Sequence, residues 1–210
     1  MNQPILYKYP RTFHFPFSEG ATSDDKILQD TAQFNGKKIV VTEKMDGENT
    51  SIYNGYFHAR SLDSKHSAYQ SWLAKFVSEM SYKIPEGYRV CGEYLYAKHS
   101  IAYNDLKSYF YGFSVWDKEH CLSWDETQEW FSLLGIESVP ILHMGNYDED
   151  LVKRIAKETV IRGGEGIVVR LYDSFEYSDF SKSVAKFVRK NHVQTDKHWK
   201  NSEIIKNNLA

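Results

Sequence analysis

The sequence predicts an α+β fold, in which strands outnumber helices and neighbouring strands pair mostly as antiparallel hairpins or meanders. Apolar runs of strand length recur along the chain, and the turn dipeptide Asn54-Gly55 lies between two of them. Fewer segments carry apolar residues at helical spacing. With 210 residues, of which 41% are hydrophobic and 15% aromatic, the chain can bury a substantial core.

The first half of the chain is expected to begin irregularly, because Pro4, Pro10 and Pro16 fall in an aromatic-rich stretch. The best helix signal is the recurrence of apolar residues at helical spacing between Tyr69 and Met80. The expected elements are a lead-in over 4–20, a short helix over 24–34, a strand over 37–43, hairpin strands over 50–53 and 56–60, and a helix over 69–80.

The second half is expected to add strands and helices with clearer boundaries. Ser123 and Glu126 have the spacing of a capping box, which predicts a helix that ends near Gly135. The other expected elements are strands over 88–97 and 108–117, a helix over 148–160, strands over 166–172 and 184–189, and a C-terminal helix over 192–208.

Composition limits the possible environments and partners. A formal net charge of -2 and a pI near 6.4 do not draw the whole chain onto a polyanion, so phosphate binding would need local basic residues. Cys91 and Cys121 lie in apolar strands and are expected to be free, buried thiols in a reducing compartment. The first residues lack the apolar core of a secretory signal, and no stretch approaches a membrane span, so we expect a cytoplasmic protein without a membrane partner.

Several common chemistries are excluded by their motifs. The glycine-rich stretch 162–166, "RGGEG", lacks the Gly-Lys-Ser/Thr ending of a P-loop and the spacing of a dinucleotide-binding fingerprint. The stretch "YGFSVW" lacks the second glycine of a hydrolase nucleophile elbow. The eight histidines are scattered and form no His-Glu-x-x-His pattern, and no Cys-x-x-Cys exists, which disfavours zinc.

The stretch 42–49, "TEKMDGEN", follows the apolar strand "KKIVV" and raises two possibilities. Asp46-Gly47 is a common turn dipeptide, so the stretch could be an ordinary turn. Alternatively, Lys44 lies at a strand end beside a tight turn, where its amine could act as a nucleophile. The stretch alone does not decide between them.

Three more charged residues lie inside apolar strands, where a charge needs an explanation: Glu93, Glu165 and Lys186. Each could be an edge residue or half of a structural ion pair. Together with Lys44, they could instead hold a divalent metal and a phosphate, because carboxylates bind hard cations and ammonium groups bind phosphoryl oxygens. Arg60 ends the predicted hairpin and could face the same pocket or solvent.

The order of these pieces resembles the covalent nucleotidyltransferase superfamily, which contains ATP-dependent DNA and RNA ligases and mRNA capping enzymes. The resemblance covers roughly residues 40–190. It rests on five stretches in order, which are "EKMDGEN", "GEYLYAKHSIAY", "YFYGFSVWD", "EGIVVR" and "AKFVRK". Asn49, five residues after Lys44, is similar to the nick-sealing RNA ligase branch. The resemblance implies a single adenylyltransferase domain over residues 1–210, an ATP-grasp-like ligase core of twisted antiparallel sheets flanked by helices.

The resemblance also implies an activity and its cofactors. Lys44 would attack the α-phosphorus of ATP to form lysyl–AMP, AMP would pass to a 5′-phosphate end, and a 3′-hydroxyl would displace it to join RNA strands, with repair of broken RNA as a role. The implied alternatives are a DNA ligase, a GTP-dependent capping-type enzyme, and a catalytically inactive nucleic-acid-binding relative. ATP and Mg²⁺ or Mn²⁺ would be the cofactors, and RNA, or DNA in the alternative, the partner.

Each site residue takes a role from the resemblance. Phe113 would stack on adenine, although a core position would also explain an aromatic there. The remaining roles are phosphate binding by Lys186 and Arg60, metal binding by Glu165 and Glu93, ribose contact by Glu93, recognition of the adenine edge by Glu43, and contact with a metal-bound water by Asn49.

Two departures from the family pattern matter. The family usually has two lysines separated by one residue in the last stretch, but Val188 stands at the second position here. Strand alternation would place Lys190 on the face of Lys186, with Arg189 as the rival. We also expect no separate OB fold or other C-terminal domain. The substrate grip would then come from the lead-in 1–35, from the basic tail 191–210, or from a protein partner. The tail could be a solvated helix; if it instead contacts the polynucleotide, deleting 196–210 should spare lysyl–AMP formation and weaken sealing.

Overall fold

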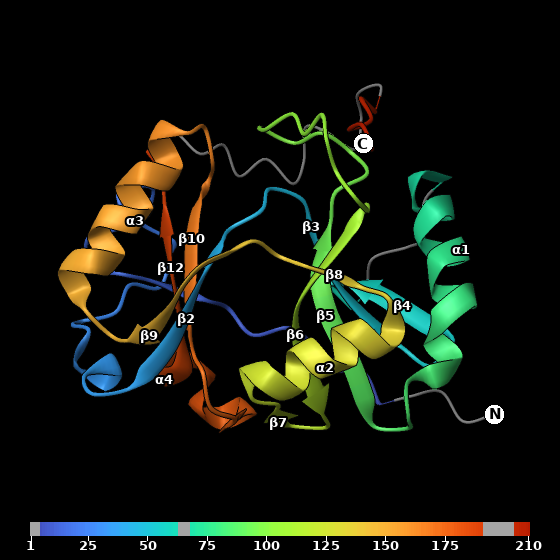
Figure 1. The fold of residues 1–210 in the computed structure, drawn as a ribbon, viewed down its shortest axis with the longest axis horizontal. Helices are drawn as coiled ribbons and strands as arrows, with labels where there is room; N and C mark the ends of the chain where they lie inside the picture. The colour runs from blue at the N-terminus through green and yellow to red at the C-terminus, as the bar shows by residue number, and fades with distance from the viewer. Residues whose placement is uncertain (1–4, 63–67, 191–203) are drawn as a thin grey trace.

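Two β-sheets face each other in the computed structural model, which describes residues 5–62, 68–190 and 204–210 (Figure 1). The first sheet has the order β1 (Phe13–His14), β12 (Val184–Val188), β10 (Gly166–Leu171), β2 (Lys38–Glu43) and β9 (Ile141–Asn146). The second has the order β11 (Phe175–Glu176), β7 (His120–Cys121), β6 (Phe110–Asp117), β5 (Tyr88–Tyr94), β3 (Glu48–Tyr53) and β4 (Tyr56–Ala59), with β8 (Glu137–Ser138) beside β6. Most neighbours are antiparallel, and the parallel pairs are β1 with β12 and β6 with β8.

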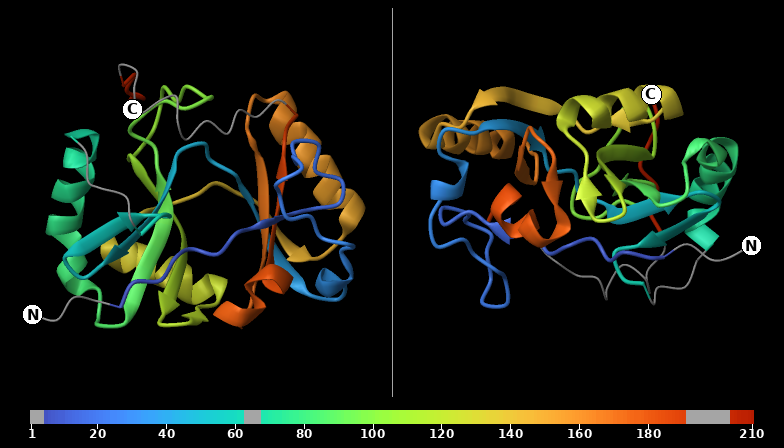
Figure 2. Two further views of the ribbon diagram at one scale, coloured as in Figure 1. Left: turned by 180° about the vertical axis from the view of Figure 1, so that it is seen from behind. Right: turned by 90° about the horizontal axis from the view of Figure 1, so that it is seen from below.

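Helices cover the outer face of each sheet (Figures 1 and 2). The α-helices are α1 (Ser71–Met80), α2 (Trp124–Leu134), α3 (Glu149–Ile161) and the short α4 (Phe180–Ser183). Single 3₁₀ turns occupy Ala32–Phe34, Ala68–Gln70, Ser81–Lys83 and Tyr177–Asp179. In the part of the chain that the structure describes, no helix is both long and apolar enough to cross a membrane.

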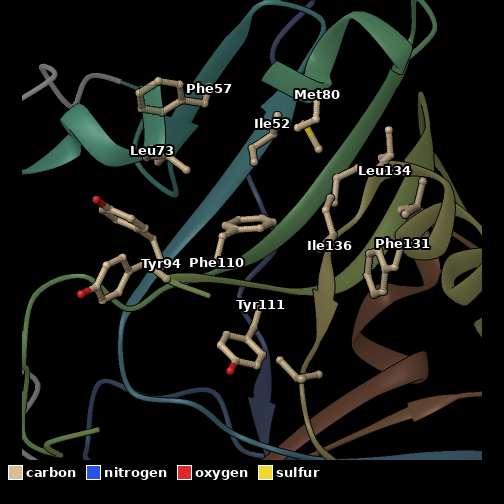
Figure 3. Packing of buried hydrophobic residues seen from close by; sticks show 14 of the residues in the cluster. Ile52, Phe57, Leu73, Met80, Tyr94, Phe110, Tyr111, Phe131, Leu134 and Ile136 are labelled. Atoms are coloured by element: carbon tan, nitrogen blue, oxygen red, sulfur yellow. The ribbon is translucent and has the colours of Figure 1, made fainter. Parts of the chain in front are cut away.

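Three apolar clusters hold these layers. Val152 and Ala156 of α3 pack on one face of the first sheet, where Ile167 is fully buried. Helices α1 and α2 cover the second sheet, and Figure 3 shows side chains such as Leu73 and Phe131 converging on its strands. A third cluster, Cys91, Trp116, Cys121, Phe175, Phe180 and Val184, combines residues of β5, β6 and β7 with residues of β12 and α4. It therefore joins the two sheets.

The chain crosses from the first sheet to the second between β2 and β3, through residues 44–47. Gly47 is needed in this crossing, because a Cβ atom there would lie 2.5 Å from the carbonyl oxygen of Tyr94. The crossing places the polar stretch that follows β2 between the two sheets.

The predicted class, α+β with antiparallel sheets flanked by helices, is confirmed. Gly55 has φ +69° in a two-residue turn that joins β3 to β4, as the Asn-Gly signal predicts. The capping box of Ser123 and Glu126 is also present, and Gly135 ends α2 in the left-handed conformation.

The predicted helix over 24–34 is wrong, because only Ala32–Phe34 is helical. The hydroxyl and the backbone N–H of Thr22 both donate to the carboxylate of Asp25, which forms a local turn. The backbone N–H of His14 donates to Lys26 O, and that of Leu28 donates to His14 O, so β1 takes hydrogen bonds that a helix would use.

The predicted C-terminal helix lies mostly outside the described residues, and its described end is wrong. Residues 204–210 are not helical, and Lys206 and Leu209 form isolated β-bridges with Ala97 and Leu106. Strand β9 was not predicted. None of its residues is fully buried. A strand without a buried face does not need alternating apolar residues, so the sequence gives no strand signal there.

Candidate active site

A cleft of about 660 Å³ lies between the two sheets. The first sheet contributes Thr42, Val168, Arg170 and Lys186 to its wall, and the second contributes Asn49, Glu93 and Phe113. Seven residues singled out from the sequence line it, namely Glu43, Lys44, Asn49, Arg60, Glu93, Phe113 and Lys186. The fold thus brings together residues that lie up to 143 positions apart in the sequence.

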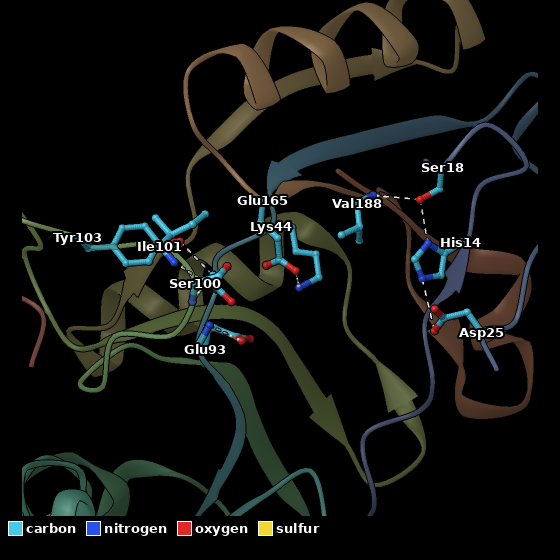
Figure 4. A network of polar contacts seen from close by, with 12 residues as sticks. His14, Ser18, Asp25, Lys44, Glu93, Ser100, Ile101, Tyr103, Glu165 and Val188 are labelled. Atoms are coloured by element: carbon cyan, nitrogen blue, oxygen red, sulfur yellow. Dashed lines mark hydrogen bonds and ion pairs between the residues drawn. The ribbon is translucent and has the colours of Figure 1, made fainter. Parts of the chain in front are cut away.

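Lys44 is held at the end of β2 by its neighbour β10. The register pairs Glu43 with Ile167, and the backbone N–H of Lys44 donates to Gly166 O at 3.0 Å. This pairing brings Lys44 to Glu165, and Lys44 Nζ donates to Glu165 Oε1 at 2.6 Å (Figure 4). The Lys44 side chain is 24% exposed, whereas that of Glu165 is fully buried. Lys44 is therefore the accessible member of the pair.

The charges around Lys44 favour its ammonium form. Burial alone would lower the pKa of Lys44, but the charges of Glu165, Glu93 and Asp46, with the hydrogen bond to Glu165, raise it above its ordinary value. In this state Lys44 is protonated, and it must lose a proton before it can act as a nucleophile.

Glu93 and Lys186 have pKa values shifted towards neutrality. Burial raises the pKa of Glu93 to about 8, against the opposing charge of Lys44. Burial and the nearby charge of Lys44 lower the pKa of Lys186 to about 8. Ligands of the opposite charge would stabilise the ionised form of each side chain.

Asp46 is buried two residues after Lys44, and one of its carboxylate oxygens accepts three hydrogen bonds. Its Oδ2 accepts from Ser100 N and Ser100 Oγ, each at 2.7 Å, and from Ile101 N at 2.8 Å. Its own backbone N–H donates to Tyr103 Oη at 2.9 Å. This aspartate therefore fixes the loop that follows β5 to the turn that follows Lys44.

Phe113 faces the cleft because of a β-bulge. The pairing of β5 with β6 shifts so that Cys91 pairs with Ser114 and Gly92 with Gly112, which leaves Phe113 as the extra residue. Phe113 is half-buried, and the ring of Tyr9 meets it edge-on at 5.3 Å between centroids. A flat ligand could stack on this ring opposite Val168.

Two oxygen donors, those of Asn49 and Glu93, line this part of the cleft, and the buried carboxylate of Glu165 lies behind Lys44. Asn49 pairs with Glu93 across β3 and β5, and its Oδ1 is buried without a hydrogen-bond partner among the described residues. Glu93 Oε1 accepts from Gly47 N at 3.1 Å. The negative charge of Glu165 contributes to the raised pKa of Glu93. Within the described ranges, no group of three histidine, cysteine, aspartate or glutamate side chains could enclose a metal. The donors that are present suit a hard cation such as Mg²⁺, which keeps several of its waters.

Two predicted site residues do not line the cleft: Glu165, which is fully buried behind Lys44, and Lys190. Strand β12 ends at Val188, so the alternation that pointed to Lys190 does not extend that far. Lys190 is exposed, whereas the backbone N–H of Arg189 donates to Glu165 O at 2.9 Å. The role of Lys190 stays a prediction.

Several residues of the N-terminal lead-in line the cleft, and the sequence analysis did not predict them individually. Figure 2 shows the lead-in crossing from the second sheet to the first, and its residues Tyr9, Pro10, Arg11, Thr12 and Asp25 line the cleft. Tyr9 O accepts from Arg60 Nε at 3.4 Å, and His14 pairs with Lys186 across β1 and β12. The sequence signal that could have pointed to these residues was the high aromatic and proline content of the lead-in.

Comparisons with known proteins identify the family and the fold of this chain. The sequence model of the RNA ligase family matches residues 37–188. Among solved structures, an archaeal ATP-dependent RNA ligase is similar at a TM-score of 0.60 and 15% identity, covering 87% of this chain and 48% of that one. Naegleria gruberi RNA ligase with PPi is similar at a TM-score of 0.55 and 20% identity, covering 89% and 61%.

A third similar structure is a protein from Aquifex aeolicus described as a candidate ATP-dependent DNA ligase. It has a TM-score of 0.56 and 19% identity, covering 87% of this chain and 50% of that one. No curated protein matches the sequence at a significant level. This chain spans about half to three fifths of the length of the three solved structures, and their likeness shows the fold.

Proposed function

Because this chain belongs to the RNA ligase family, we propose that it is an ATP-dependent RNA ligase that joins a 5′-phosphate end to a 3′-hydroxyl end through lysyl–AMP on Lys44. The observation that carries this proposal is the position of Lys44. It is a partly exposed lysine in the cleft, paired with buried Glu165 and lying within the region that matches the family.

The first step would form a phosphorus–nitrogen bond. The Lys44 ammonium loses a proton, to solvent or to Glu165, and its Nζ lone pair attacks the α-phosphorus of ATP. The bond from this phosphorus to the bridging oxygen breaks, and pyrophosphate leaves. An oxygen of the RNA 5′-phosphate then attacks the same phosphorus and releases Lys44 as an amine. Finally the 3′-hydroxyl oxygen attacks the 5′-phosphorus, loses its proton to solvent, and releases AMP.

The cations of the cleft would bind the phosphates. Lys186 lies on β12 with its pKa lowered by burial, and a bound triphosphate would favour its charged form. Arg60 follows β4 and lines the same cleft, where its guanidinium can bind phosphoryl oxygens. These charges would also oppose the carboxylates that keep Lys44 protonated. Arg189 and Lys190 are the two candidates for a further cation.

The base and the ribose would lie against the second sheet. Phe113 would stack on adenine from its bulge on β6, and Glu43 would accept a hydrogen bond from the adenine edge. Glu93 is close enough to the cleft to contact the ribose hydroxyls. Every one of these residues lies within the matched region.

Glu93 and Glu165 would hold a divalent cation, Mg²⁺ or Mn²⁺, and Asn49 would contact one of its waters. The fit rests on the two carboxylates and on the buried, unpartnered Oδ1 of Asn49 among the described residues. When bound, the metal would supply positive charge that stabilises the negative phosphoryl oxygens. A structure of a Naegleria gruberi RNA ligase variant contains ATP and Mn, which supports a divalent metal.

We place this activity in the repair of broken RNA. The cleft would bind the nucleotide. We expect residues of the lead-in, several of which line the cleft, or a protein partner to contribute to the grip on the RNA.

Incubation with α-³²P-labelled ATP, followed by a denaturing gel, tests the proposal. We expect a labelled protein band that needs Mg²⁺ or Mn²⁺ and that Lys44→Ala and Lys44→Arg both lose, because arginine stays protonated and cannot attack. Labelled GTP should give no band, and nicked RNA should be sealed faster than nicked DNA. A band retained in Lys44→Ala would refute the assignment of the nucleophile.

A further inference from the structure

The described C-terminal residues 204–210, here called the C-terminal segment, dock on the loop region that follows β5. Asn207 is only 2% exposed, and both polar atoms of its side chain are used. Its Nδ2 donates to Leu95 O at 2.8 Å, and its Oδ1 accepts from Tyr103 N at 3.0 Å. A buried amide with this many well-placed partners fixes the position of the surrounding backbone.

Backbone hydrogen bonds reinforce the docking. Lys98 N donates to Ile205 O at 2.7 Å, Asn207 N to Tyr96 O at 2.9 Å, and Asn208 N to Tyr103 O at 2.9 Å. The C-terminal segment therefore borders the loop over residues 98–104 at both ends. This segment lies outside the region 37–188 that matches the family.

The same loop reaches the turn that follows the proposed nucleophile. Tyr103 is the direct link, because its backbone N–H bonds Asn207 while its Oη accepts from Asp46 N at 2.9 Å. Ser100 and Ile101 add the three hydrogen bonds to Asp46 Oδ2. Asp46 is two residues from Lys44 and is 5% exposed, so its position constrains the chain on which Lys44 lies.

We propose that Asn207 and Tyr103 are positioning residues for Lys44. The C-terminal segment holds the loop 98–104 in place, the loop holds Asp46, and Asp46 sets the turn from which Lys44 reaches the cleft. This inference rests on the proposed adenylylation of Lys44. It assigns to the C-terminal segment a part in the first chemical step.

Two pairs of variants separate this role from general stability. Tyr103→Phe removes the hydroxyl that bonds Asp46, whereas Tyr94→Phe removes a buried hydroxyl that donates to Tyr69 O at 2.8 Å, a bond made neither to Asp46 nor to the C-terminal segment. Asn207→Ala removes the buried amide, whereas Asn208→Ala removes an exposed amide whose Nδ2 donates to Asn104 Oδ1 at 3.3 Å. Within each pair, the same chemical group is lost.

The measurement is the single-turnover rate of lysyl–AMP formation at saturating ATP, together with amide hydrogen exchange. Tyr103→Phe should slow this rate about five- to tenfold, equivalent to the roughly 1 kcal/mol of one hydrogen bond, without changing the Kd for ATP. Tyr94→Phe and Asn208→Ala should stay within about twofold of wild type. Asn207→Ala should slow the rate and accelerate exchange of the Ser100 and Ile101 amides.

Equal rates for Tyr103→Phe and Tyr94→Phe would overturn the proposal, as would unchanged exchange of both amides in Asn207→Ala. If the wild-type protein formed no lysyl–AMP at all, the proposed ligase function would fail instead. The exchange measurement needs no activity, so it would still test whether the C-terminal segment holds the loop.

Discussion

Lys44 and Glu165 form a short ion pair in which one partner is fully buried and the other reaches the cleft. Removing one member of such a pair leaves a charge without its partner in a poorly solvated place. The pair also keeps Lys44 protonated, because the charge of Glu165 raises its pKa. The proposed chemistry therefore needs a ligand that competes for Glu165 and frees Lys44.

Glu165→Gln should slow lysyl–AMP formation at least about tenfold at saturating Mg²⁺, because an amide lacks the charge needed to hold the metal. Single-turnover labelling measures the rate, and circular dichroism must remain native. Glu158→Gln, at an exposed position on α3, is the matched control and should behave as wild type. Near-normal adduct formation by Glu165→Gln would reject its metal role.

His14 predicts a pH dependence of stability. Burial and the charges of Lys186 and Lys44 lower the pKa of His14 to about 4, whereas an unfolded histidine titrates near 6.5. Between these values the unfolded state binds more protons, so stability is lost as the pH falls from about 6.5 towards about 4. We expect a loss of about 1–2 kcal/mol in the free energy of unfolding between pH 7 and pH 5.

Urea unfolding at the two pH values measures this loss. His14→Gln should be less stable at pH 7, because Gln cannot reproduce the ring contact with Ser18, but its stability should change less between pH 7 and pH 5. His143→Gln on the edge strand β9 should keep the wild-type difference. An equal difference in wild type and His14→Gln would show that other groups cause it.

Helices, strands and turns were predicted correctly where the local sequence signal favours the same backbone conformation as the tertiary contacts. Asn54-Gly55 and the Ser123–Glu126 capping box fix their backbones by their own chemistry, so both were correct. The helix over 24–34 failed because His14, a distant residue, takes its backbone hydrogen bonds. Strand β9 is exposed along much of its length, so it carries no alternation to detect.

The site shows the same division. Lys44 and Glu165 could each be singled out from the sequence as an unusual charge, because each interrupts or ends an apolar strand. Tyr9, Tyr103 and Asn207 could not, since aromatic and amide residues in irregular stretches carry no periodic signal. Their contacts depend on how segments far apart in the sequence pack.

The end of β12 changes the expected order of two variants. The strand stops at Val188, and the backbone bond to Glu165 O places half-buried Arg189 beside the Lys44–Glu165 pair, whereas Lys190 is exposed. Because Arg189 is the nearer of the two cations, we now expect Arg189→Ala to slow lysyl–AMP formation more than Lys190→Ala. The sequence alone predicted the opposite order. Rates for both variants, each normalised to wild type, measure the difference, and a larger effect of Lys190→Ala would restore the original assignment.

At the scale of the whole molecule, the C-terminal segment changes what truncation should do. The sequence predicted that deleting residues 196–210 would spare lysyl–AMP formation. The structure instead ties residues 204–210 to the loop that holds Asp46. We therefore expect this deletion to reduce lysyl–AMP formation about tenfold or more and to lower the Tm.

Labelling and thermal unfolding of the truncated protein measure both effects. A deletion that stops before residue 204 and removes only residues 196–203 is the matched control for loss of chain length. Full adenylylation by the protein that lacks 196–210 would show that the loop 98–104 keeps its position without the C-terminal segment.

The crossing from β2 to β3 gives the cleft a mechanical property. Lys44 is attached to the first sheet through Gly166 and, two residues later, to the second sheet through Asp46 and Gly47. The backbone that carries Lys44 is therefore anchored to both walls of the cleft within residues 44–47. A displacement of one sheet relative to the other would act directly on the residue that bears the attacking amine.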